Sequence, residues 1–123
     1  MAIKEYVVWQ SVEEFIDYVV EGLDRSVTGV YGLPRGGLLF AVMLSHRLNV
    51  PMLMSPIDGC LIVDDICDSG ESLLHYVNDT SGTGKKKYVV ATMYYKENSL
   101  GVIPDIWMYE KEDKWIVFPW EEV

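Results

Sequence analysis

The sequence from Leu61 to Ser72 reads LIVDDICDSGES, and this stretch decides the fold. Its first three residues continue the wholly apolar run Cys60 to Val63, which is typical of strands buried in parallel sheets. Two carboxylates, Asp64 and Asp65, follow at the point where this strand is expected to end, and Asp68-Ser69-Gly70 comes next. Ligands bind outside the carboxyl ends of the strands in open α/β sheets. The stretch therefore predicts a binding site at the end of a buried parallel strand.

The segment after the two carboxylates has the composition of an anion-binding turn. Ser69, Gly70 and Ser72 leave backbone N–H groups free to converge on an anion, at the entry of a short helix expected over about 72–77. Asp64 and Asp65 can accept hydrogen bonds from hydroxyl groups or face a Mg²⁺. Each piece alone is common, since Asp-Asp is often a solvated turn and Asp-Ser-Gly a helix entry. Their order after an apolar strand predicts a ligand that carries both a diol and a phosphate.

Strand and helix patterns alternate along the rest of the chain. A short edge strand is expected within 2–9, and Ser11 with Glu14 forms a capping-box pattern that predicts the start of a helix. A second helix is expected over 38–48. Further strands are expected at about 27–33, 51–55, 88–95 and 105–109. This alternation predicts an α/β fold with a mainly parallel central sheet flanked by helices, and 123 residues suit a single domain, 1–123.

Composition limits the classes of function. The net charge of −9 and the pI near 4.5 argue against nucleic acid as a partner. No apolar run approaches the length of a membrane span. Cys60 and Cys67 lack a CxxC pattern and partnering histidines, which predicts reduced thiols and argues against zinc. We expect a cytoplasmic protein with no membrane partner.

A second candidate anion loop, Leu33-Pro34-Arg35-Gly36-Gly37, follows the strand expected at 27–33. Glycines allow close backbone approach to a ligand, and Arg35 offers paired donors to a phosphate. Taken alone, the segment also fits a simple turn with an exposed arginine. Two anion loops at neighbouring strand ends would match a ligand phosphorylated at both ends.

These motifs resemble the type I phosphoribosyltransferases, whose ribose-phosphate motif is an apolar strand, two acidic residues and Asp-Thr/Ser-Gly-x-Thr/Ser. The resemblance implies that Asp64 and Asp65 hold the ribose hydroxyls and a Mg²⁺, directly or through water. It implies that Asp68 acts as general acid or base near N7 of a purine. The 5′-phosphate would be held by the loop Asp68, Ser69, Gly70, Glu71 and Ser72.

The resemblance extends to the pyrophosphate loop and the base pocket. Pro34, Arg35, Gly36 and Gly37 match the pyrophosphate loop of the same family. The last third of the chain is similar to the xanthine-guanine branch, which implies that Lys96, Trp115 and Ile116 bind the purine. From the residues alone, Trp115 also fits core or dimer packing, and Lys96 also fits a solvated strand end.

One departure from the family concerns the hood, a long flexible segment that closes over the ligand in active members. Here only Ser55 to Gly59 separates Met54 from Cys60, which is the length of a tight turn.

Two hypotheses about function follow. The first is a purine phosphoribosyltransferase that uses Mg²⁺, phosphoribosyl pyrophosphate and a 6-oxopurine. The second is a weakly active or inactive protein of this fold that binds nucleotide as a sensor or regulatory subunit. Either is expected to form a homo-oligomer, with a dimer as the simplest case, since the apolar tail Trp115 to Trp120 and hoodless helices would leave apolar surface exposed.

Overall fold

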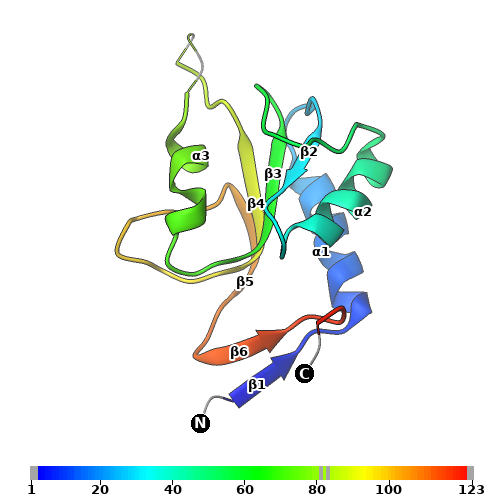
Figure 1. Cartoon of the computed structure of the whole chain (residues 1–123), viewed down its shortest axis with the longest axis vertical. Coiled ribbons are helices and arrows are strands. Elements are labelled where there is room, and N and C mark those ends of the chain that lie inside the picture. The colour runs from blue at the N-terminus through cyan, green and yellow to red at the C-terminus, as the bar shows by residue number, and fades with distance from the viewer. Residues whose placement is uncertain (1–2, 81, 83, 122–123) are drawn as a thin grey trace.

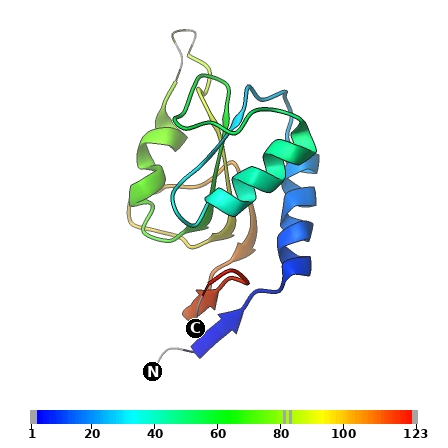
Figure 2. The ribbon, with the colours of Figure 1, turned by 45° about the vertical axis from the view of Figure 1, so that its right-hand side comes forward.

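The computed structural model describes residues 3–80, 82 and 84–121, and its centre is a four-stranded parallel sheet. The strands lie in the order β2 (Val30–Gly32), β3 (Leu61–Cys67), β4 (Val89–Tyr95) and β5 (Ile106–Glu110). Helices α1 (Trp9–Gly22) and α2 (Leu38–Leu48) cover one face of the sheet (Figure 1). The short helices η1 (Glu71–Leu73) and α3 (Leu74–Asn78) lie on the other face (Figure 2). The predicted α/β class and the mainly parallel sheet are confirmed.

Two hydrophobic clusters follow from the alternation of side chains along the strands. Leu61 and Val63 of β3 face the cluster that contains α1 and α2, and Ile62 faces the cluster that contains Leu73 and Val77. Because β3 is apolar on both faces, both layers of helix pack against it. The wholly apolar run seen in the sequence therefore places β3 at the centre of the molecule.

A second, two-stranded sheet joins the two ends of the described chain. β1 (Ile3–Tyr6) pairs in parallel with β6 (Lys114–Val117), in the register Ile3 to Lys114. Figure 1 shows this small sheet beyond one end of the central sheet. The short edge strand predicted within 2–9 is present, and it belongs to this small sheet rather than to the central one.

Aromatic side chains pack the segment after β6 onto the helices. The ring of Phe40 on α2 meets Phe118 at 5.9 Å and Trp120 at 5.3 Å between centroids, both edge to face. Phe118 and Trp120 stack at 5.1 Å, and Phe15 of α1 meets Phe40 at 5.2 Å. Such aromatic pairs add stabilisation beyond the area that they bury. This cluster fixes the small sheet relative to the main domain.

Three local predictions were wrong in detail. The helix predicted to open at Ser11 begins at Trp9, and Val8 is its N-cap with no side-chain cap, so Ser11 lies in the first turn. The strand predicted over 51–55 is reduced to one isolated bridge between Val30 and Met52. β3 extends to Cys67, so Asp64 and Asp65 lie within the strand rather than after it. Strand pairing with β4 continues through these polar residues and overrides their low strand propensity.

The short connection before β3 is a tight turn, as its length predicts. The amide of Cys60 donates to Ile57 O at 3.1 Å, and Gly59 takes a positive φ of 79°. Thr28 holds the turn from outside, because its hydroxyl donates to Asp58 O at 2.9 Å. The connection between Met54 and Cys60 is thus fixed against the domain.

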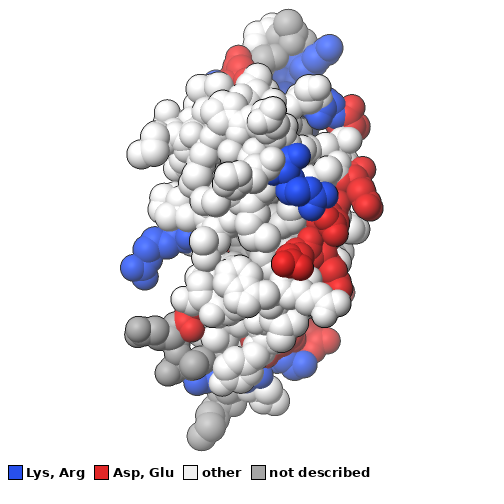
Figure 3. Space-filling view, turned by 90° about the vertical axis from the view of Figure 1, so that its right-hand side faces the viewer, with Lys and Arg blue, Asp and Glu red and all other residues white. Residues whose placement is uncertain are grey.

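The surface is acidic around α1. Glu13, Glu14, Asp17 and Glu21 are all exposed on this helix, and Asp17 pairs with Arg47 of α2 at 2.5 Å. Figure 3, which faces this side of the molecule, shows acidic side chains gathered along one margin. Within the described part of the chain, no helix is both long and apolar enough to cross a membrane.

The aromatic cluster generates the first prediction. Phe40→Ala should lower the free energy of unfolding by about 3–5 kcal/mol, because the ring is fully buried among Phe15, Phe118 and Trp120. Urea denaturation followed by circular dichroism measures this change. His46→Ala, at an exposed position of the same helix, is the control and should cost less than about 1 kcal/mol. Equal costs for the two variants would contradict the central place given to the cluster.

Candidate functional site

The carboxyl end of β3 carries the acidic pair. Asp64 and Asp65 are consecutive in the strand, so their side chains leave opposite faces of the sheet. Each carboxylate accepts a hydrogen bond from the next amide, Asp65 N to Asp64 Oδ1 and Ile66 N to Asp65 Oδ1, both at 2.8 Å. These bonds fix the directions of the two carboxylates.

The loop with Arg35 lies directly against this end of β3. The amide of Leu33 donates to Val63 O at 3.0 Å, and the amide of Gly37 donates back to Leu33 O at 2.8 Å. A Cβ on Gly36 would collide with the Asp65 carboxylate, and one on Gly37 with the carbonyl of Val63. The peptide bond between Pro34 and Arg35 is cis. Because glycine has no Cβ, this loop can approach β3 closely enough to adjoin Asp65.

The loop after β3 is shaped by Gly70, whose φ is +84°. The hydroxyl of Ser69 accepts from the Glu71 amide at 3.3 Å, and the amide of Leu73 donates to Gly70 O at 3.3 Å. Gly70 packs against Val102, which Asn98 holds by two hydrogen bonds of 2.8 and 2.9 Å. The turn after Asp68 is thus supported from the β4–β5 connection.

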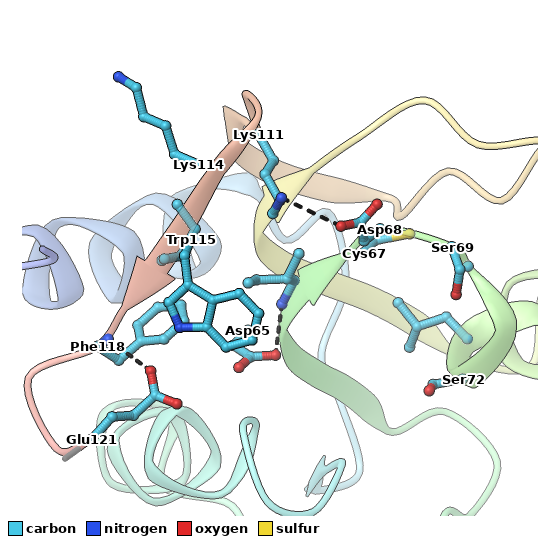
Figure 4. Close-up of a pocket in the computed structure, with 14 residues that line it drawn as sticks. Asp65, Cys67, Asp68, Ser69, Ser72, Lys111, Lys114, Trp115, Phe118 and Glu121 are labelled. Atoms are coloured by element: carbon cyan, nitrogen blue, oxygen red, sulfur yellow. Dashed lines mark hydrogen bonds and ion pairs between the residues drawn. The ribbon is translucent and has the colours of Figure 1, made fainter. Parts of the chain in front are cut away.

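A cleft of about 360 Å³ opens between this loop and the small sheet (Figure 4). Its volume lies within the range of small-molecule sites. One side carries Asp65 and the loop from Asp68 to Ser72, and the other carries residues of β6 and the segment after it. The lining residues are Asp65, Ile66, Cys67, Asp68, Ser69, Gly70, Ser72, Leu73, Lys111, Lys114, Trp115, Ile116, Phe118 and Glu121.

Trp115 gives the cleft a flat aromatic wall. Its side chain is 65% exposed, so its position does not fit core packing, whereas Phe118 beside it is buried. Glu121 accepts from the Phe118 amide at 2.8 Å and ties the turn that follows β6. An exposed indole in a cleft can stack on a planar ligand.

Two lysines lie near Asp68, and they differ in direction. Lys111 is only 14% exposed in its side chain and reaches Asp68 Oδ2 at 3.4 Å. Lys96 instead pairs with Asp113 at 3.1 Å, and that pairing is the main reason that its pKa is raised. Lys96 does not line the cleft, whereas Lys111 does.

Burial changes the acidity of groups at the end of β3. Burial raises the pKa of Asp64 to about 8, and the hydrogen bond and charge of Asp65 add to this effect. Burial also raises the pKa of the Cys67 thiol to about 11, with smaller contributions from the charges of Asp64 and Asp68. Asp64 therefore favours its neutral form, and Cys67 is a thiol rather than a thiolate nucleophile.

The structure gathers half of the predicted site residues in the lining of the cleft. Asp65, Asp68, Ser69, Gly70, Ser72, Trp115 and Ile116 line one cleft. Gly36 adjoins Asp65 from outside the cleft lining, together with Pro34, Arg35 and Gly37 of its loop. Asp64, Glu71 and Lys96 also lie outside the lining.

Sequence reasoning did not identify Lys111, Phe118 and Glu121, which also line the cleft. Nothing in the composition around Lys111 distinguishes it, because it stands among Glu110, Glu112 and Asp113 in a charged turn. The pairing of β1 with β6 positions the segment that carries Phe118 and Glu121, and the amide of Lys111 donates to Tyr95 O at the end of β4. No local pattern predicts these contacts between distant segments.

No model of a protein family matches the chain. It is 26% identical, over 76% of its length and 70% of the relative's, to a xanthine-guanine phosphoribosyltransferase of Idiomarina loihiensis. Among solved structures, a purine phosphoribosyltransferase of Pyrococcus horikoshii superposes with a TM-score of 0.79 at 29% identity, covering 98% of this chain and 95% of that one. The xanthine-guanine-hypoxanthine phosphoribosyltransferase of Helicobacter pylori superposes at 0.77, covering 98% and 93%, and at 20% identity this likeness shows the shared fold.

These findings confirm the resemblance found in the sequence motifs, and the proteins that the chain resembles are enzymes. The likeness covers the central sheet, the flanking helices and the small sheet together, since almost the whole chain aligns with the two solved structures. The chain therefore has the fold of the type I phosphoribosyltransferases and is similar in sequence and structure to the purine, xanthine-guanine members.

Proposed function

We propose that the chain is a purine phosphoribosyltransferase that transfers the 5-phosphoribosyl group from phosphoribosyl pyrophosphate to a 6-oxopurine. The observation that carries this proposal is the cleft that joins Asp65, the loop from Asp68 to Ser72 and the exposed ring of Trp115. A carboxylate, an anion-binding turn and a flat aromatic wall suit the ribose, the phosphate and the base of one ligand. The names of the relatives support the same class of activity.

The reaction assigns a task to each group. The C1′–N9 bond forms, the bond from C1′ to the pyrophosphate oxygen breaks, and the proton that leaves the base passes from N7 to Asp68. The loop of Arg35 and the two glycines would hold the departing pyrophosphate, and Trp115 would stack on the base while Ile116 offers backbone groups to its 2-substituent. These tasks rest on positioning and on the neutralisation of charge rather than on a covalent intermediate.

The acidic pair also suits a Mg²⁺ bound together with the ligand. Asp65 lines the cleft and offers a carboxylate, the donor type that Mg²⁺ prefers, whereas Asp64 would have to lose its proton to join it. In the described part of the chain no group of three or more potential metal ligands gathers. Mg²⁺ that binds together with a phosphorylated substrate usually takes only one or two carboxylates from the protein, and substrate oxygens and waters complete its coordination shell. When bound, the ion would neutralise negative charge on the pyrophosphate.

The small sheet offers an alternative to the absent hood. Trp115 and Ile116 of β6 close one side of the cleft, so part of the cover comes from the paired ends of the described chain. The aromatic cluster around Phe40 holds this cover in place. A fixed wall excludes less water than a closing lid. We therefore expect some hydrolysis of phosphoribosyl pyrophosphate without base, alongside transfer of the phosphoribosyl group to the base.

The test of the proposed function is release of pyrophosphate from phosphoribosyl pyrophosphate and Mg²⁺, with and without hypoxanthine or guanine. We expect release to rise with base and to yield the nucleoside 5′-monophosphate. A folded sample with no release, and with no rise in melting temperature at millimolar ligand, would reject the proposal. Tight nucleotide binding without turnover would instead support a sensor.

Asp68→Asn is the matched variant for this assay. It should lower turnover by about 10²–10⁴-fold, because the amide cannot take up the proton from the base. Binding of phosphoribosyl pyrophosphate should change little, since backbone amides hold most of the phosphate. Equal losses in binding and in turnover would instead mark Asp68 as a residue that only shapes the loop.

Asp64 generates a prediction about stability. Its pKa is about 8 in the fold against 3.8 for a free side chain, so its ionisation opposes folding as pH rises from about 4 through 8. Asn at this position stays neutral, so Asp64→Asn should raise the free energy of unfolding at pH 8 by about 1–3 kcal/mol, the equivalent of one to two pKa units, and should raise the melting temperature with it. The gain should vanish near pH 4. Glu97→Gln, at an exposed position, is the control, and a gain that does not depend on pH would refute this explanation.

Self-association is the last part of the proposal. Leu38, Leu39 and Val42 leave an exposed apolar stripe on α2, beside the Arg35 loop. Such a stripe on a small acidic protein supports a second copy of the chain as its partner. Light scattering at micromolar concentration should give the mass of a dimer, and Val42→Glu should give the monomer. A wild-type mass equal to the monomer would count against the proposal.

A further inference from the structure

We infer that Tyr94 is a positioning residue for the base: through its hydrogen bond to Glu5, it fixes the wall of the cleft that carries Trp115. This inference rests on the proposed function and deepens it, because it names a residue outside the cleft on which binding of the base depends. Tyr94 and Glu5 belong to none of the sequence motifs that predict the site, and both lie outside the lining of the cleft.

Strand β1 turns its glutamate inward and its apolar side chains outward. Ile3 and Tyr6 are 67% and 61% exposed, whereas Glu5 is the one residue of this strand that is partly buried. A strand attached by apolar packing alone would bury its isoleucine or tyrosine and expose its glutamate. Positions that break such a local rule are expected where the structure has a functional constraint. The inward carboxylate of Glu5 therefore requires a specific partner.

That partner is the hydroxyl of Tyr94, which donates to Glu5 Oε2 at 2.8 Å. Tyr94 is buried near the carboxyl end of β4. Burial raises the pKa of the Tyr94 hydroxyl, and the hydrogen bond and the charge of Glu5 add to this effect. The hydroxyl therefore keeps its proton at neutral pH and donates to a charged acceptor, which is the stronger kind of hydrogen bond.

The ring of Tyr94 contacts the other half of the small sheet. It meets Phe118, which follows β6, edge to face at 6.1 Å between ring centroids. On the neighbouring strand β3, the residue in register with Tyr94 is Ile66, which lines the cleft. Tyr94 thus lies next to a lining residue and contacts both the strand β1 and the segment that follows β6.

The pairing of β1 with β6 passes this constraint to the wall of the cleft. Glu5 pairs with Ile116, and the residue before it pairs with Trp115. Figure 1 shows the small sheet beyond the end of the central sheet, and a second hollow of about 350 Å³, lined in part by Glu5 and Tyr94, opens where β1 meets the ends of β4 and β5. Because side chains do not fill this space, the hydrogen bond is a large part of the contact there. Loss of the bond should therefore let Trp115 and Ile116 shift together.

The opposite wall of the cleft has separate support. Asp65 belongs to β3 itself, and the loop from Asp68 to Ser72 packs through Gly70 against Val102 in the β4–β5 connection. Neither depends on β1. Loss of the Tyr94 hydroxyl should therefore weaken contacts with the base and leave contacts with the phosphoribosyl group in place, because precise binding needs a supported wall.

The experiment uses Tyr94→Phe, which keeps the ring and removes the hydroxyl. The KM for hypoxanthine should rise by about 3- to 10-fold, which is less than the roughly 10- to 100-fold of a direct hydrogen bond to a charged group, because the effect is transmitted through the wall. The rise in melting temperature with inosine 5′-monophosphate should become smaller. The rise with phosphoribosyl pyrophosphate and Mg²⁺, a ligand without a base, should equal that of the wild type.

Two variants of Glu5 test the same bond from its other side. Glu5→Ala removes the acceptor and should give the same selective rise in the KM for hypoxanthine. Glu5→Gln keeps an uncharged acceptor and should give a smaller rise. Should Tyr94→Phe fail to fold, Glu5→Ala carries the comparison, because the Glu5 side chain is 38% exposed and its removal leaves the aromatic core intact.

A Trp115→Ala background tests the route of the effect. Because Tyr94 acts through the wall, Tyr94→Phe should change the KM for hypoxanthine little once the indole is absent. Tyr109→Phe is the matched control: its ring lies 5.4 Å from that of Tyr94, its hydroxyl is not part of the bond to Glu5, and it should behave as the wild type. Urea denaturation measures the stability of every variant.

The outcomes distinguish this inference from the function on which it rests. Equal losses for the base and for phosphoribosyl pyrophosphate in Tyr94→Phe would mean that the hydroxyl only stabilises the fold, which overturns the inference and leaves the proposed function standing. An unchanged KM in Tyr94→Phe and Glu5→Ala overturns it as well, and so does a full effect in the Trp115→Ala background. A folded wild type with neither turnover nor ligand-induced stabilisation overturns the proposed function, and the inference fails with it.

Discussion

The packing of Phe118 and Trp120 against Phe40 is the contact on which the site depends. It joins the end of the chain to α2, and α2 in turn packs on the central sheet. Val7 and Ile116, which are buried in the same hydrophobic cluster, and the hydrogen bond of 2.8 Å from the Tyr94 hydroxyl to Glu5 add to this attachment. The aromatic contact thus fixes the small sheet as one wall of the cleft. Trp115 lies on this wall, and Asp65 lies on the other side of the cleft.

A second constraint acts at the opposite wall, where backbone approaches side chain. Gly36 and Gly37 let the Arg35 loop lie against β3, and Gly70 lets the next loop turn back with a positive φ. The conformation of both loops therefore depends on glycines, which have no Cβ. The acidic pair between them bears the electrostatic cost, since Asp64 is buried beside Asp65 and its pKa is raised to about 8. The burial of this carboxylate therefore costs the fold stability as pH rises.

The sequence predicted what depends on local pattern. The apolar run before Asp64 identified the central strand, and the helix over Leu38–Leu48 has the predicted bounds. The loop from Asp68 to Ser72 and Trp115 were expected in one site, and they line one cleft. What could not be predicted depends on pairing between distant segments. Strand propensity does not reveal that β1 joins β6. It also does not reveal that the amide of Lys111 bonds to Tyr95 O or that Lys96 pairs with Asp113.

The parallel pairing of β1 with β6 also determines when the cleft can exist. Ile3 pairs with Lys114, so the wall that carries Trp115 is built from residues near opposite ends of the described chain. Closing so long a loop costs entropy that only later contacts repay, and such pairings form late in folding. On the ribosome, β2, β3 and the loop from Asp68 to Ser72 emerge long before β6. A nascent chain could therefore assemble the half of its cleft that carries Asp65 and this loop well before the wall that carries Trp115.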